Sequence, residues 1–412
     1  MTTTIVAIFV IVYLGMILGG LPFLQLDRTG VALLGAIALL GVNALSLDEA
    51  VKAIHLPTPV LLFSFMVISA QMRLGGFYDW ITHKLATLSI SPPALLGVLI
   101  AVSAGLSAVF SNDIVCLAMA PVLIDACEKR RLAPLPYLLA LACSANIGSA
   151  ATLIGNPQNM LIGQTLQLSF DGYLRDALIP VGLGLLTSWV VIVWQTGGRW
   201  QSQPDAGAQE PRAERIPFDP LQTAKGLLIA TALLLAFLFA PWPREHMALI
   251  GAGILLTSRK LHSRRMLGLL DWELLILFMS LFVVNQALQR SGVTAQAIAA
   301  LSASGVHLTE LGTLFASTFL LSNIVSNVPA VMLLLPVSQH ALAGTLLALV
   351  STLAGNLLIV GSIANIIVVD AAARRNLHID WRSHARVGIP VTLASLAITA
   401  IYLALRLQFA AG

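Results

Sequence analysis

Four polar clusters interrupt the long apolar stretches of this 412-residue sequence, and each combines serine or asparagine with glycine or proline. They lie within residues 110–113, 146–159, 322–329 and 354–365. Polar side chains are costly at membrane depth and therefore mark candidate binding sites. The residues that we expect to bind a substrate or an ion are Ser111, Asn112, Asp113, Ser149, Gly155, Asn156, Asn159, Ser326, Asn327, Gly355, Asn356, Ser362 and Asn365.

Helices broken in the middle would supply the chemistry of such sites. Pro157 has no backbone N–H to donate and clashes with the preceding turn, and glycine accepts the dihedral angles of an unwound stretch. The carbonyl groups freed in this way can coordinate a cation together with Ser and Asn oxygens, and freed N–H groups can hold an anion. We expect a Na⁺ site at Ser111, Asn112 and Gly155. The alternative is that Ser, Asn and Asp here only cap helices.

Asp113 is the one acid in these clusters. A carboxyl group at membrane depth favours its neutral form unless it is paired, which suits proton coupling or a cation site. An ordinary helix cap in a solvated cavity is the alternative. Cys116 and Cys143 could be soft ligands for arsenic(III), but such cysteines are more often small core residues.

The composition places the clusters inside a membrane. The chain is 58% hydrophobic and 10% charged, with a mean hydropathy of +0.88, whereas soluble domains average about 25% charged residues. Apolar stretches recur from end to end, and a membrane-spanning helix needs about 20 mostly apolar residues. We therefore expect an all-α polytopic membrane protein with about ten transmembrane helices.

The chain resembles itself in order along its length. Residues 31–40 (VALLGAIALL) and 247–256 (MALIGAGILL) are identical at six of ten positions, and later Asn112 corresponds to Asn327. Several matches at a nearly constant offset indicate a duplication. The expected divisions are a first repeat over residues 1–196, a cytoplasmic linker over 197–222 and a second repeat over 223–412.

Loop charge indicates that the two repeats are inverted. Residues 43–59 carry one lysine and no arginine, whereas the equivalent residues 257–270 carry four basic residues, and cytoplasmic loops are enriched in Lys and Arg. Residues 93–127 are too few for two full spans and a turn, since each span needs about 20 residues. The expected elements are re-entrant hairpins at 93–127 and 308–340, and helices broken at the midplane at 135–170 and 346–371.

On this topology both termini lie outside, and 18 of the 23 Lys and Arg residues lie inside. The basic runs at residues 128–131 and 258–265 then set orientation, and we expect no nucleic-acid partner. The expected partners are a small anion, a coupling ion and the lipid bilayer. No cofactor is expected.

The clusters resemble those of the ion transporter superfamily, which includes arsenite-efflux permeases, citrate permeases, sodium/proton antiporters and divalent-anion/sodium symporters. The resemblance covers nearly the whole chain and is clearest in FSNDIVCLAMAPVL, SANIGSAATLIGNPQN and LLSNIVSNVPAVMLLLP. It implies a scaffold domain and a transport domain that moves as an elevator, often within a homodimer.

The hairpin tips favour one branch of that superfamily. In the divalent-anion symporters both tips read Ser-Asn-Thr, whereas here the third position is Asp113 in one tip and Val328 in the other. This pattern looks more like the arsenite and citrate permeases. The resemblance then implies functional roles for Asn112, Asp113, Asn156, Asn327 and Asn356.

The expected function is secondary active transport of a small anion or oxyanion, arsenite- or citrate-like, coupled to H⁺ or Na⁺ in a bacterial inner (plasma) membrane. A sodium/proton antiporter of the same fold is the alternative and would need Asp113 without moving an anion. A channel is less expected, because inverted repeats with broken helices favour alternating access. An enzyme is not expected, since the sequence has no HExxH or GxSxG motif. A primary pump is not expected either, since no lysine is preceded by the glycine that a P-loop requires.

Overall fold

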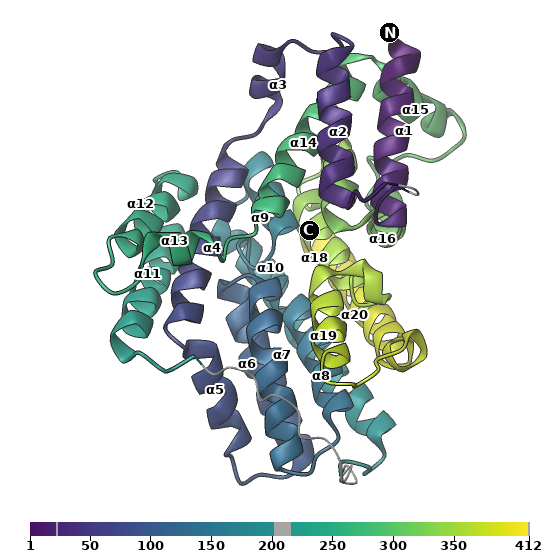
Figure 1. Ribbon diagram of the computed structural model, residues 1–412. Helices are drawn as coiled ribbons and strands as arrows, with labels where there is room; N and C mark the ends of the chain where they lie inside the picture. Colours follow the sequence, from purple (N-terminus) through teal and green to yellow (C-terminus); the bar gives the residue numbers. More distant parts are fainter. Residues whose placement is uncertain (22–23, 202–215, 411–412) are drawn as a thin grey trace.

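The computed structural model describes residues 1–21, 24–201 and 216–410, and in these ranges the chain is a bundle of α-helices (Figure 1). Helix makes up 77% of the described residues. The described residues form no β-sheet, only two isolated bridges, Gly20 with Asp27 and Leu132 with Gln201. The prediction of an all-α fold is confirmed. Residues 202–215, the middle of the expected linker, lie outside the described part.

The first half of the bundle contains a hairpin, α6 with α7, and a broken helix whose two pieces are α8 and α9. Its helices are α1 (Thr2–Leu18), α2 (Arg28–Gly41), α3 (Leu47–Ala53), α4 (Pro57–Leu74), α5 (Phe77–Ala86), α6 (Pro92–Val109), α7 (Asn112–Lys129), α8 (Pro134–Ser149), α9 (Pro157–Thr165) and α10 (Phe170–Thr196).

The second half repeats this order, with α16 and α17 as its hairpin and α18 and α19 as its broken helix. The equivalent short helices α5 and α15 lie at opposite ends of the molecule, as inverted repeats require (Figure 1). Its elements are α11 (Pro220–Phe239), α12 (Arg244–Leu256), α13 (Ser263–Leu267), α14 (Trp272–Arg290), α15 (Val293–Ala303), α16 (Leu311–Val325), α17 (Asn327–Leu334), η1 (Leu335–Val337), α18 (Ala343–Ala354), η2 (Ile359–Gly361), α19 (Ile363–Ala373) and α20 (Trp381–Ala410).

Six helices of the described chain are long and apolar enough to cross a membrane by length and composition: α4, α6, α10, α11, α14 and α20. Five of these are expected spans, and α6 is a hairpin arm. Three other expected spans are shorter helices, since α1, α2 and α12 have 17, 14 and 13 residues. The remaining two are the broken helices, whose pieces are each too short to be counted alone.

The arms of the first hairpin are longer than a re-entrant loop requires. Helices α6 and α7 have 18 residues each, which is about 27 Å of helix and close to the thickness of the hydrocarbon core. Length alone therefore does not distinguish this hairpin from two spans. What identifies it is the position of its tip, which contacts the break between α8 and α9.

The two halves are interleaved. Helix α2 packs against α14 and α4 packs against α12, while α10 packs against α20. At the centre, α8 contacts α19 and α9 contacts α18. Each of these contacts has an equivalent in which the two halves exchange roles, so that α2 with α14 corresponds to α12 with α4. Together they bring the two broken helices into contact with each other.

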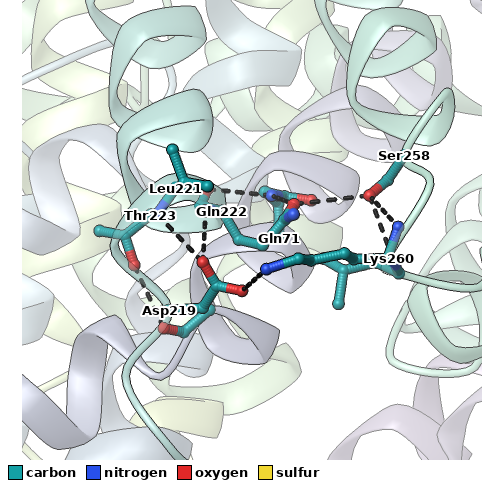
Figure 2. A network of polar contacts seen from close by, with 9 residues as sticks. Gln71, Asp219, Leu221, Gln222, Thr223, Ser258 and Lys260 are labelled. Atoms are coloured by element: carbon teal, nitrogen blue, oxygen red, sulfur yellow. Dashed lines mark hydrogen bonds and ion pairs between the residues drawn. The ribbon is translucent and has the colours of Figure 1, made fainter.

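A polar network ties the end of α4 to the start of the second half (Figure 2). The buried Gln71 side chain donates through Nε2 to the backbone oxygen and to Oε1 of Gln222, at 2.9 and 3.0 Å. Asp219 caps α11 by accepting from the Gln222 N–H at 3.2 Å and forms an ion pair with Lys260 at 3.3 Å. Ser258 donates to Gln222 Oε1 at 3.5 Å. The network therefore joins α4, α11 and the loop after α12.

Helix α9 begins where the sequence predicts a break. Pro157 occupies its first turn, where the missing N–H would have had no partner inside the helix. Asn156 caps the same helix, since its side chain accepts from the Asn159 N–H at 2.9 Å. Pro157 thus starts α9, whereas α8 already ends at Ser149, and the residues between them are available for other contacts.

Candidate functional site

The tip of the first hairpin meets the break between α8 and α9. Asn112 donates from Nδ2 to Asn146 Oδ1 at 3.0 Å, and its backbone N–H contacts Gly155 O at 3.4 Å. The position of Gly155 requires glycine, because a Cβ atom there would lie 2.3 Å from Ser149 O and 2.7 Å from Ser107 O. Two clusters that are separate in the sequence are therefore in direct contact.

Asn146 connects the first hairpin to the second broken helix. Its Nδ2 donates to Asn356 Oδ1 at 2.8 Å and to Asn365 Oδ1 at 3.0 Å. Its Oδ1 accepts from Ser362 Oγ at 2.8 Å as well as from Asn112. All four bonds of this one amide go to residues that the sequence marks as candidates.

A second network joins the start of α9 to α18. Asn156 donates from Nδ2 to Ser149 Oγ at 3.0 Å and to Thr352 Oγ1 at 3.2 Å. Gln158 Nε2 also donates to Thr352 Oγ1, at 3.2 Å. Asn159 extends this network, because its Nδ2 donates to the hydroxyl of Tyr173 at 3.1 Å. These side chains are buried, so the network is shielded from bulk water.

The tip of the second hairpin packs over the break between α18 and α19. A Cβ atom at Gly355 would lie 3.2 Å from Asn327 Nδ2, and one at Gly361 would lie 3.5 Å from Asn323 Oδ1. Ser326, between α16 and α17, has a φ of 76° and a ψ of 160°, a region that is almost exclusive to glycine. The second tip is therefore held by close packing and carries backbone strain.

Equivalent oxygen atoms in the two hairpins are left without partners. Asn112 Oδ1 and Ser107 Oγ in the first hairpin are buried and form no hydrogen bond with the described residues, and the same is true of Asn327 Oδ1 and Ser322 Oγ in the second. Buried polar atoms of folded proteins are normally satisfied. Oxygen atoms of this kind are the ligands that hard cations prefer.

Asp113 follows Asn112 at the start of α7. It is half-buried, and among the described residues it has neither a hydrogen bond nor an ion pair. The simple capping role fails for the tip serines, because neither Ser111 nor Ser326 forms a side-chain bond to the helix that follows. Asn156 does act as a helix cap.

The structure brings ten of the thirteen candidates into the two networks or the packed glycine contacts. Ser111, Asp113 and Ser326 stay at the hairpin tips without side-chain partners among the described residues. The residues that the list of candidates omits are Ser107, Asn146, Gln158, Tyr173, Ser322, Thr352 and His384. His384 contacts Asn356 O through Nε2 at 3.0 Å. Asn146, Gln158 and Ser322 lay in the polar clusters and could have been chosen. Tyr173 and His384 lie in charged stretches outside the clusters, where a polar residue is not conspicuous.

Two further expectations concern metal-binding side chains. Cys116 and Cys143 are buried and unpaired, which fits small core residues. In the part of the chain that the structure describes, no group of three His, Cys, Asp or Glu residues could hold a metal ion. A Na⁺ site at Ser111, Asn112 and Gly155 would use neutral oxygens and stays a prediction.

Comparison with known proteins places the chain in a family. A model of citrate transporters matches residues 6–354, which is most of the sequence. The chain belongs to the citrate transporter family. A silicon efflux transporter from Oryza sativa subsp. japonica is 29% identical over 451 residues, covering 92% of each chain. A 46 kDa membrane protein of Mycobacterium leprae is 32% identical over 84% of this chain and 85% of its own.

A crystal structure supports the fold of this citrate transporter family member. The YdaH transporter of Alcanivorax borkumensis, which has an unusual topology, matches with a TM-score of 0.60 over 99% of this chain and 98% of its own. The sequence identity is 14%, so the likeness concerns the fold alone. Membership of the citrate transporter family identifies the chain as an integral membrane protein and a secondary transporter.

The site of this family member is built from uncharged groups with a single acid. Its described side chains offer amides, hydroxyls, the imidazole of His384 and one carboxyl group, and none of them is a lysine or an arginine. The N-termini of α7, α9, α17 and α19 also point their free N–H groups toward this region, and such termini favour negative charge. The site can thus donate and accept many hydrogen bonds but has no cationic side chain to neutralise a highly charged anion.

Proposed function

We propose that this protein carries a small oxyacid such as arsenite, coupled to H⁺ or Na⁺, across a bacterial inner (plasma) membrane. The observation that carries the proposal is the absence of lysine and arginine among the described side chains of the site. Arsenite near neutral pH is mainly the uncharged trihydroxide, which needs hydrogen bonds. Citrate would bring several carboxylates, for which arginine and lysine are the usual partners.

The silicon efflux transporter from rice supports the same class of substrate. Silicic acid, like arsenite, is a small and mostly uncharged molecule whose polar groups are all hydroxyl groups. A site lined by asparagine amides suits such a molecule, because an amide both donates and accepts, and the buried Oδ1 atoms of Asn112 and Asn327 have no hydrogen-bond partner among the described residues. We therefore include silicic acid with arsenite in the proposed substrate class.

Asp113 is the proposed coupling residue. It carries a half-buried carboxyl group and directly follows Asn112, whose Oδ1 is buried and has no hydrogen-bond partner among the described residues. Loss or gain of a proton there, or of a Na⁺ ion, would change the charge of the site by one unit. This arrangement also favours the second candidate function, a sodium/proton antiporter of the same fold.

Alternating access by an elevator movement belongs to the same proposal. Hydrogen bonds link α8, α9, α18, α19 and the first hairpin tip, so these elements would move as one transport domain. The network around Gln222 joins α4 to α11, and these two helices would belong to the scaffold domain. A homodimer through the scaffold is also part of the proposal.

The test is arsenite uptake into everted inner-membrane vesicles under an imposed proton or sodium gradient. Native protein is compared with Asp113→Asn, and the matched control is Glu310→Gln, which removes an exposed acid at the start of the second hairpin. We expect gradient-dependent uptake in the native protein and the control and its loss in Asp113→Asn. Silicic acid and citrate are measured in parallel.

Three results would count against the proposal. Uptake of citrate without arsenite or silicic acid would contradict the argument from the uncharged site. Exchange of Na⁺ for H⁺ without movement of any oxyacid would favour the antiporter. Native uptake by Asp113→Asn would remove the coupling role of that carboxyl group.

A further inference from the structure

A cavity lies outside the polar networks of the candidate site, where the first residues of α8, the last residues of α10 and the first residues of α20 come together. Its volume is about 730 Å³, which is in the range of pockets that bind organic ligands. One part of the wall is apolar and the other is polar. The apolar residues include Leu135, Pro136, Leu139, Ile192 and Val387, and the polar ones include Gln195, Thr196, Arg199, Ser383 and Arg386.

Two arginines stand at this cavity, one from each side. Arg199 follows α10 and Arg386 lies in the second turn of α20, and both are exposed. Neither takes part in an ion pair with the described residues. Gln195 donates to the backbone oxygen of Arg386 and joins the two helix ends.

One acid balances part of this positive charge. Asp380 caps α20 by accepting from the Ser383 N–H at 2.8 Å. Its bonds to Ser383, together with Arg382 and Arg386, hold the pKa of this carboxyl group below its usual value. With Arg199, Arg382 and Arg386 against Asp380, the mouth of the cavity keeps an excess of positive charge.

The same end of the bundle has the features of a membrane interface. Trp194 and Trp381 are 79% and 68% exposed, and exposed tryptophan is typical of the headgroup level. Beyond them, the outer faces of α10 and α20 are apolar and exposed, for example at Leu186 and Leu393. The cavity therefore opens where an acyl chain and a headgroup would meet.

We propose that this cavity binds an anionic phospholipid of the cytoplasmic leaflet. The phosphate would lie between Arg199 and Arg386, and one acyl chain would follow Leu135, Leu139 and Val387. Basic pockets between membrane helices on the cytoplasmic side are suited to acidic headgroups. An inorganic anion would use the arginines but leave the apolar wall uncovered.

A lipid in this cavity would touch helices that also form the site. Ser383 lines the cavity, and the next residue, His384, contacts Asn356 O at 3.0 Å. One turn later Gly388 lies so close to the broken helix that a Cβ atom would be 2.4 Å from Asn356 O. Leu139 lies on α8, which continues to Asn146. A bound lipid would therefore brace α8, α10 and α20 directly below the polar networks.

The experiment measures binding of a fluorescent phosphatidylglycerol to the purified full-length protein in detergent. The test variant is Arg199→Gln with Arg386→Gln. The matched control is Arg264→Gln with Arg265→Gln, which removes two exposed arginines from α13, outside the cavity. We expect the test variant to bind roughly tenfold to thirtyfold more weakly, as the loss of two basic contacts predicts, and the control to bind like the native protein.

Competitors distinguish a lipid from a free anion. Unlabelled phosphatidylglycerol should displace the probe, whereas phosphatidylcholine, inorganic phosphate and glycerol 3-phosphate in large excess should not. Leu135→Trp, which fills the apolar side from an exposed position, should weaken binding of the probe in a protein that elutes and unfolds like the native one. The proposal is overturned if phosphate or phosphatidylcholine competes as well as phosphatidylglycerol, or if the double arginine variant binds as the native protein does.

Discussion

The two hairpins occupy equivalent places in the two halves, but their tips are held differently. In the first, Asn112 donates to the side chain of Asn146, and two arms of 18 residues support the tip. In the second, the arms have 15 and 8 residues, and the Asn327 side chain forms no hydrogen bond with the described residues. The first tip carries Asp113 and the second carries the buried Val328 at the corresponding position.

The difference indicates that the two hairpin tips have different roles in transport. Moving the first tip would break a buried hydrogen bond, which costs more than the bond itself contributes, because its partners lose water as well. Moving the second tip would break only packing contacts and would release strain at Ser326. We infer that the first hairpin moves with the broken helices and holds the coupling ion, and that the second is the easier one to open. Four predictions test this comparison.

The largest effect is expected from removing the tip asparagines one at a time. Asn112→Ala and Asn327→Ala should each lower uptake in the vesicle assay about 100-fold, because no water replaces a lost polar group at membrane depth. Only Asn112→Ala should also lower the free energy of unfolding, by about 1 kcal/mol. Thermal unfolding in detergent measures this second effect. Normal transport by both variants would refute the hairpin site.

The base of the first hairpin is tied down by an ion pair. Asp125 of α7 pairs with Arg375, after α19, at 3.1 Å, and their side chains are 8% and 12% exposed. Asp125→Asn should lower the free energy of unfolding by about 3 kcal/mol, because a largely buried arginine loses its partner. The control is Asp171→Asn in the exposed pair with Arg175, where the change should stay below about 1 kcal/mol. Equal changes would mean that the pair near α19 contributes no more than a surface contact.

The two glycines at the breaks should tolerate a methyl group differently. Gly155→Ala forces a Cβ atom against two backbone carbonyls and should destabilise the protein by about 2 kcal/mol. Gly355→Ala meets Asn327 Nδ2 and Thr352 O at 3.2 Å and Gly361 O at 3.3 Å. These contacts are longer than those at Gly155, so the change should cost less than about 1 kcal/mol and mainly reduce uptake. Chemical unfolding and uptake are measured on both. A larger loss of stability from Gly355→Ala would reverse the comparison of the tips.

The smallest effect concerns backbone strain at the second tip. Ser326→Gly should stabilise the protein by about 1 kcal/mol, because glycine adopts a φ of 76° without strain. Ser111→Gly, at a φ of −56°, should be neutral or slightly destabilising. Paired thermal unfolding curves separate the two outcomes. A loss of stability in Ser326→Gly would show that its side chain, and not its backbone, matters at this tip.

Much of the fold follows from local sequence. Pro157, with Gly155 and Asn156 before it, predicts a break between α8 and α9, and the structure has this break. The prediction succeeds because proline and glycine affect the backbone conformation of only the few residues around them. Helices shorter than a full span were harder to foresee, because apolar residues continue past the end of α2 at Val42, Ala44 and Leu45. The candidate list also missed Thr352, Tyr173 and His384, whose roles depend on partners far along the chain.

Composition and periodicity by themselves determined that this protein is an all-helical membrane bundle with duplicated polar breaks, because a bilayer requires long apolar helices and makes every buried polar residue conspicuous. Only the tertiary structure decided which polar residues meet. Asn146 binds residues 210 and 219 positions away, and hydrogen bonds of such range depend on how the interleaved halves pack. No local pattern records that packing, since each partner alone looks like another asparagine in an apolar helix.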